Sequence, residues 1–110
     1  MIMDSHINLS DGLDKLKESG NLFLEVFTHG SLSAELYQPE KIDLQKPHTR
    51  DEVYIIVSGK GTFVNDGQEA TFNPGDFLFV KAGAEHRFQD FSDDFATWVF
   101  FYGPEGGENR

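Results

Sequence analysis

The chain has 110 residues, of which 38% are hydrophobic and 14% aromatic, and its formal net charge is −10. This length and composition predict one domain over residues 1–110 with a core of its own, while the acidic excess argues against nucleic acid and anionic membrane surfaces as partners. The absence of cysteine excludes disulfides and thiolate metal sites.

Residues 1–21 form an N-terminal segment in which we expect one short helix. Ser10 is a candidate N-cap, Leu13 and Leu16 share one helical face, and Gly20 is a candidate C-terminal stop. Acidic residues interrupt the segment and no continuous apolar stretch occurs in it, which argues against a secretory signal peptide. No part of the chain approaches the roughly 18 apolar residues of a membrane helix. A cytoplasmic location is therefore expected.

After residue 21 the hydrophobic period changes to two, which is typical of strands. Alternation predicts strands at 22–27 and 32–37 with a turn at His29-Gly30, and three further apolar runs predict strands at 53–57, 77–80 and 95–102. The last run is apolar almost throughout, which predicts a strand covered on both faces, one of them by a partner subunit. Turn residues recur between the runs, and we interpret residues 58–61 as a hairpin turn.

Many short strands with regular turns predict a mostly β protein. The expected architecture is an antiparallel jelly-roll, or double-stranded β-helix, barrel of about eight strands over residues 22–102. Residues 103–110, rich in glycine and acidic residues, are predicted to be a flexible tail. The pattern predicts an architecture and not a function.

His48, Glu52 and His86 are candidate metal ligands beside the apolar runs. On a straight strand His48 and Glu52 would lie about 13 Å apart, whereas metal bonds to such ligands are about 2.0–2.2 Å long. A shared ion therefore requires the chain to turn at residues 49–51, which would place His48 and Glu52 on neighbouring strands. His86 would have to come from a third strand on the same interior face.

The stretch from Lys46 to Glu52, with Gly59 seven residues further on, resembles the first motif of the cupin superfamily. Its second motif is matched by Gly75, Gly83, His86 and Asp90. The resemblance covers about residues 46–90. Cupins are small β-barrels that often bind a divalent metal through histidines and a glutamate of these motifs. Membership would imply such a barrel here.

The resemblance implies a ligand set of His48, Glu52 and His86. Lys46 stands where the family usually has its first histidine, while Lys81 replaces a common proline and Asp90 a common asparagine. Two imidazoles and one carboxylate form the set associated with facial-triad iron(II) sites, and zinc, manganese and nickel also accept it. The expected cofactor is thus a divalent ion (Fe, Zn, Mn or Ni).

Lys46 and Tyr37 are the candidate catalytic residues. A lysine beside a metal could hold an anionic substrate or, with a lowered pKa, act as a base. Tyr37 shares one strand face with Glu35, and both side chains could line the cavity as acid–base or substrate-orienting groups.

Three functions stay open. The first is a metal-binding barrel that holds a small organic ligand and, if it is an enzyme, performs dioxygenase-type chemistry. The second is a ligand-binding or sensory module without turnover, and the third is a metal-independent isomerase or epimerase that uses Lys46, Tyr37 and a histidine. We expect a small-molecule ligand and a homodimer, with no nucleic-acid or membrane partner.

Overall fold

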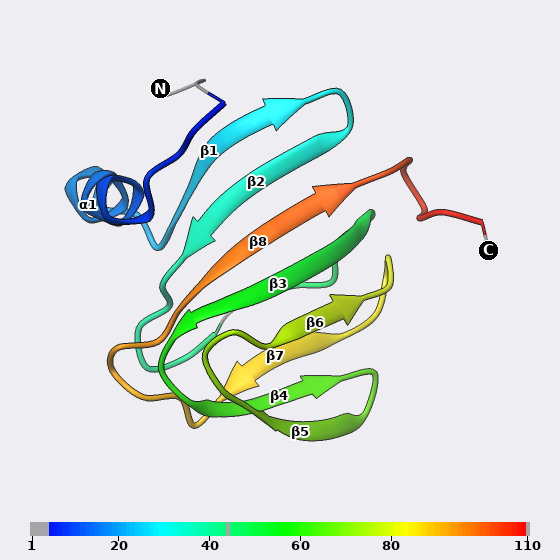
Figure 1. Ribbon diagram of the computed structural model, residues 1–110. Helices are drawn as coiled ribbons and strands as arrows, with labels where there is room; N and C mark the ends of the chain where they lie inside the picture. The colour runs from blue at the N-terminus through cyan, green and yellow to red at the C-terminus, as the bar shows by residue number, and fades with distance from the viewer. Residues whose placement is uncertain (1–4, 44, 110) are drawn as a thin grey trace.

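The computed structural model describes residues 5–43 and 45–109, which form two antiparallel β-sheets and one helix (Figure 1). The elements are α1 (Leu9–Ser19), β1 (Phe23–His29), β2 (Leu32–Tyr37), β3 (Asp51–Ser58), β4 (Gly61–Asn65), β5 (Gln68–Phe72), β6 (Phe77–Val80), β7 (His86–Gln89) and β8 (Ala96–Tyr102). The predicted mostly β jelly-roll with one short N-terminal helix is confirmed. Within the described ranges, no helix has the length and apolar character needed to span a membrane.

Helix α1 begins after Asn8, whose extended backbone lets its side chain accept a hydrogen bond from the backbone N–H of Asp11 at 3.1 Å. The predicted cap at Ser10 is therefore wrong, because Ser10 already lies inside the first turn. Gly20 ends the helix in the left-handed conformation, as expected. A Cβ at Gly12 would lie 2.7 Å from Leu36 Cδ1, so this glycine allows the helix to approach the sheet.

The larger sheet has the order β1-β2-β8-β3-β6. Its outer face is covered at the β1-β2 end by α1, where Leu16, Val26 and Leu36 form a buried cluster that Trp98 of β8 packs against. Strand β8 thus has one face toward the helix and one toward the barrel core. The outer face is uncovered at the other end, where the edge strand β6 leaves Phe77 64% and Phe79 45% exposed.

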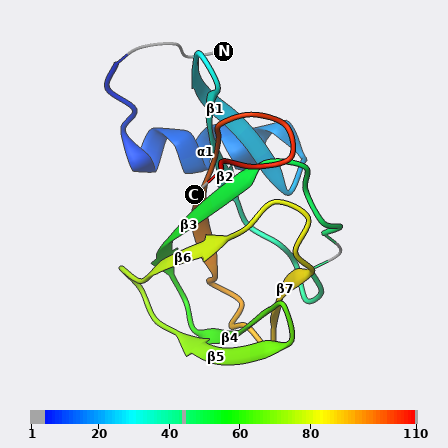
Figure 2. The same cartoon turned by 90° about the vertical axis from the view of Figure 1, so that its right-hand side faces the viewer.

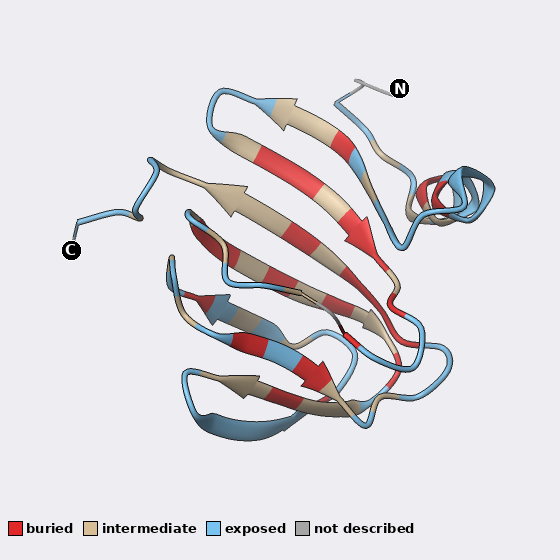
Figure 3. Ribbon diagram, turned by 180° about the vertical axis from the view of Figure 1, so that it is seen from behind, coloured by how far each residue is buried: buried red, intermediate tan, exposed pale blue. Residues whose placement is uncertain are grey.

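The smaller sheet has the order β5-β4-β7 and closes the barrel over the inner face of the larger one (Figure 2). Tyr54 and Val99 of the larger sheet meet Phe63, Phe72 and Phe88 of the smaller sheet in one core. Buried positions recur along β2, β8 and β3, the three central strands of the larger sheet (Figure 3).

The turn at residues 58–61 connects the two sheets. Strand β3 pairs with β6 and β8, whereas β4 pairs with β5 and β7, so the predicted hairpin is wrong. Gly59 has a φ of 88° and a Cβ there would lie 2.6 Å from Phe95 Cα. This crossing therefore requires glycine both for its backbone conformation and for the close approach of the chain.

Candidate metal centre

A bend at residues 48–50 leads into β3, and hydrogen bonds from distant parts of the chain hold it. The carbonyl of His48 accepts from Gly83 N at 2.7 Å, and that of Thr49 accepts from Gly106 N at 2.7 Å. The Asp51 carboxylate accepts from the backbone N–H groups of Ala82, at 3.0 Å, and Glu108, at 2.8 Å. These two bonds lower the pKa of Asp51.

The same bonds place residues 106–108, part of the predicted tail, against the bend. They establish where this segment lies. Its flexibility stays a prediction.

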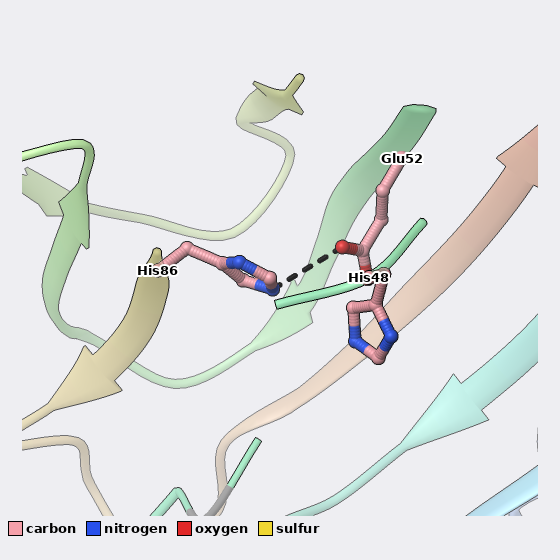
Figure 4. A group of neighbouring side chains, drawn as sticks. All are labelled: His48, Glu52 and His86. Atoms are coloured by element: carbon pink, nitrogen blue, oxygen red, sulfur yellow. Dashed lines mark ion pairs between the residues drawn. The ribbon is translucent and has the colours of Figure 1, made fainter. Parts of the chain in front are cut away.

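The bend brings the three expected ligands together. His48, Glu52 and His86 each offer a ligand atom, and these atoms lie within 4.8 Å of one another. Figure 4 shows the His86 ring directed at the Glu52 carboxylate, with the His48 side chain beside this pair. Glu52 comes from β3 and His86 from β7 of the other sheet, whereas His48 lies in the bend itself, so the prediction that it lies on a neighbouring strand is wrong.

The contact between His86 and Glu52 has the chemistry of a cation site. His86 Nδ1 lies 3.0 Å from the carbonyl oxygen of Ala84, which can only accept, so Nδ1 donates and the neutral ring presents the lone pair of Nε2 to Glu52. Nε2 and Glu52 Oε1 are 3.2 Å apart, and neither atom has a hydrogen-bond partner within residues 5–43 and 45–109. Two buried lone pairs facing each other require a proton or a metal ion between them.

The surroundings of this pair favour a positive charge on His86. Glu52 is 0% exposed and His86 5%. Burial alone would lower the pKa of His86, but the Glu52 carboxylate and the Ala84 carbonyl outweigh it and raise that pKa. Burial and the charge of Glu52 also raise the pKa of Tyr54 well above its usual value, which keeps this phenol protonated.

Aromatic rings form the walls of the centre. The His48 ring lies edge-on to Phe101 with centroids 4.9 Å apart, and its centroid is 5.4 Å from that of His86. Phe63 and Tyr54 lie on the other side of His86, at 6.3 and 6.1 Å between centroids. These walls limit the number of water molecules that can reach the ligands and so strengthen electrostatic interactions there.

A buried polar network borders the centre, and sequence reasoning missed it. The Asp43 carboxylate accepts from Tyr37 OH at 2.6 Å, from Phe88 N at 2.9 Å, and from both the backbone and side-chain nitrogens of Gln45 at 3.1 and 2.9 Å. Gln45 Oε1 in turn lies 3.3 Å from His48 Nε2 and 3.0 Å from Tyr54 OH. The only sequence signal was a polar Gln three residues before His48.

The two candidate catalytic residues differ in environment, since Tyr37 is buried and Lys46 is exposed. The Tyr37 hydroxyl donates to Asp43, and burial followed by this bond raises the pKa of Tyr37 above its usual value. Lys46 is exposed and lines a surface cavity of about 440 Å³ together with Gln45, His86 and Arg87. Catalytic roles for Lys46 and Tyr37 stay predictions.

Glu35 lies in the register position opposite Glu25 on β1 and Val99 on β8, on the inner face of the larger sheet. Burial, then the negative charges of Glu25 and Glu52, raises the pKa of Glu35 to about 7. It is thus a half-buried carboxyl that titrates near neutral pH.

Known proteins resemble this chain over most of its length. A family model described as a cupin domain matches residues 34–102. An uncharacterised protein of Streptomyces coelicolor is 33% identical over 85 residues, covering 76% of this chain and 81% of that protein. The crystal structure of a Neisseria meningitidis protein, NMB1881, is similar in fold with a TM-score of 0.71 at 20% identity, over 90% of this chain and 100% of that one.

A shorter similarity links the chain to acireductone dioxygenase of Bacillus subtilis. The two are 44% identical over 54 residues, which is 44% of this chain and 30% of the enzyme. The chain therefore spans less than a third of that enzyme's length.

Proposed function

Because this chain belongs to the family of cupin domains, we propose that its barrel binds a divalent metal ion through His48, Glu52 and His86 and presents that ion to a small organic ligand. One observation carries the proposal: the buried atoms Glu52 Oε1 and His86 Nε2 face each other with no hydrogen-bond partner among the described residues, beside a second histidine. Such a set suits a transition metal because two imidazoles and a carboxylate leave coordination positions open.

We further propose dioxygenase-type chemistry. The partial similarity to acireductone dioxygenase supports this reaction class. A bound iron ion would polarise an oxygen-rich substrate and activate O₂. The chain's own contribution is to fix the orientation of the His86 ring through Ala84 and to exclude water with the rings of Phe63 and Phe101.

The charges that line the surface cavity beside His86 favour an anionic ligand. Its lining includes Lys46 and Arg87, two cations on a chain of net charge −10, and among the described residues Glu85 is the one acidic side chain in it. A small organic acid bound there would meet the positive charges of Lys46 and Arg87 as well as the proposed metal ligand His86. We propose that Lys46 holds such an anion.

Metal analysis tests the proposed site. Protein purified without a histidine tag should contain close to one divalent ion per chain after incubation with Fe²⁺, Mn²⁺ or Ni²⁺ and desalting, and His86→Ala should lose it. His29→Ala, which changes an exposed histidine at a turn, is the matched control and should retain the ion. Equal, substoichiometric metal in all three proteins would refute the site.

Oxygen consumption separates an enzyme from a binding module. The Fe²⁺-loaded protein should consume O₂ when given an enediol substrate, and His86→Ala should not. If the native protein instead releases a bound organic acid unaltered and consumes no O₂ with any enediol tested, it is a ligand-binding or sensory module.

A further inference from the structure

The neutral amide of Gln45 has a fixed orientation. Its Nε2 donates to Asp43 Oδ2 at 2.9 Å. Asp43 receives three other donors, Tyr37 OH, Gln45 N and Phe88 N, so its oxygens act as acceptors and the amide cannot be reversed. The carbonyl oxygen of Gln45 is consequently the atom that faces His48 and Tyr54.

The distance from this oxygen to His48 is one that two ligands of the same ion would show. With metal bonds of about 2.1 Å, two ligands lie about 3.0 Å apart at an octahedral right angle and about 3.4 Å apart at the tetrahedral angle. Gln45 Oε1 and His48 Nε2 are 3.3 Å apart, and Glu52 Oε1 and His86 Nε2 are 3.2 Å apart. Both pairs fall within this interval.

Lys46 stands at the sequence position of the first histidine of the first motif, but its side chain does not take the place of that histidine. Its side chain is exposed and lines the surface cavity. Gln45 precedes it, is half-buried, and turns its side chain toward the ligands because Asp43 holds both its backbone N–H and its amide.

We propose that Gln45 supplies, through Oε1, a fourth protein ligand to the metal held by His48, Glu52 and His86; this inference rests on the proposed function. The donor set becomes two nitrogens and two oxygens, one of them charged. Carbonyl and carboxylate oxygens suit manganese and iron(II) better than they suit copper. Four ligands of an octahedral ion also leave two positions for a chelating substrate.

Manganese binding to two variants tests the inference. Gln45→Ala and Gln45→Met both remove the carbonyl, and the methionine variant keeps the side-chain volume in case the alanine variant does not fold. Each should raise the Kd for Mn²⁺ in titration calorimetry by about tenfold or more. Gln68→Ala, on exposed strand β5, is the matched control and should leave the Kd unchanged.

Water relaxation distinguishes a ligand from a residue that only orients His48. Loss of a ligand opens a third position to water, so the proton relaxivity of the saturated Mn²⁺ complex should rise by about half in the Gln45 variants. A Kd within twofold of the unsubstituted protein, or a weaker Kd with unchanged relaxivity, would overturn the inference and leave the three-residue site standing. If the unsubstituted protein binds no Mn²⁺, Fe²⁺ or Ni²⁺, the proposed function itself fails.

Discussion

Replacing Glu35 with glutamine should change how stability depends on pH. Glu35 faces Glu25 across the β1–β2 pair, and its pKa is raised from 4.5 to about 7 by burial and by the charges of Glu25 and Glu52. The folded state therefore binds more protons than the unfolded state between these two values. Because of this difference, the free energy of unfolding should fall as pH rises through that window.

The size of the effect follows from the shift. A shift from 4.5 to about 7 corresponds to roughly 3 kcal/mol, but Glu35 is partly exposed and solvent screening reduces this to about 1–2 kcal/mol. The glutamine side chain of the Glu35→Gln variant carries no charge at any pH, so this position costs the variant no unfolding free energy in that pH window. Relative to the variant, the unsubstituted protein should therefore lose about 1–2 kcal/mol between pH 4.5 and pH 8.

Urea unfolding at pH 4.5, 6, 7 and 8 with a chelator measures this difference without a contribution from bound metal. Glu69→Gln on exposed strand β5 is the matched control and should follow the unsubstituted protein. Glu25→Gln removes one cause of the shift and should flatten the profile in part. Parallel profiles for Glu35→Gln and the unsubstituted protein would refute the reasoning.

Two further predictions concern the helix cap and the outer face. Asn8→Ala should lower the free energy of unfolding by about 1 kcal/mol in urea titrations because it removes the cap of α1, and an equal or larger loss from Ser10→Ala would contradict the assignment. A homodimer stays a prediction, and Phe77 and Phe79 of β6 are two exposed apolar side chains that we expect a second copy to cover. Phe77→Ser with Phe79→Ser should then convert a dimer to a monomer in light scattering, whereas an unsubstituted protein that is already monomeric contradicts the prediction.

Local patterns in the sequence located β1, β2, β3, β6 and β8 but gave no bounds for β4, β5 and β7. Strands at 22–27 and 32–37 were expected, and β1 and β2 occupy residues 23–29 and 32–37. The cap was misplaced because Ser10 and Asn8 are both good capping residues, and sequence alone does not show where the chain enters the helix. The turn at 58–61 was misread because glycine suits a hairpin and a crossing between sheets equally well.

The meeting of His48, Glu52 and His86 was predictable from the sequence, whereas the contacts that hold these residues together were less so. The need for a turn between His48 and Glu52 followed from strand geometry, and the structure has a bend there. The partners that hold this bend, Gly83, Gly106 and Glu108, are tens of residues away in sequence. Gln45 was missed because residues 38–50 show no periodicity from which the direction of a side chain can be read.

The hydrogen bonds from residues 106–108 to the bend have a practical consequence for anyone who handles this protein. Thr49 and Asp51 immediately adjoin two of the three ligands, and both are held by this late part of the chain. A purification handle or fluorophore attached near residue 108 would pull on ligand geometry directly. A fall in metal occupancy after such labelling would then report a displaced bend in an otherwise intact barrel.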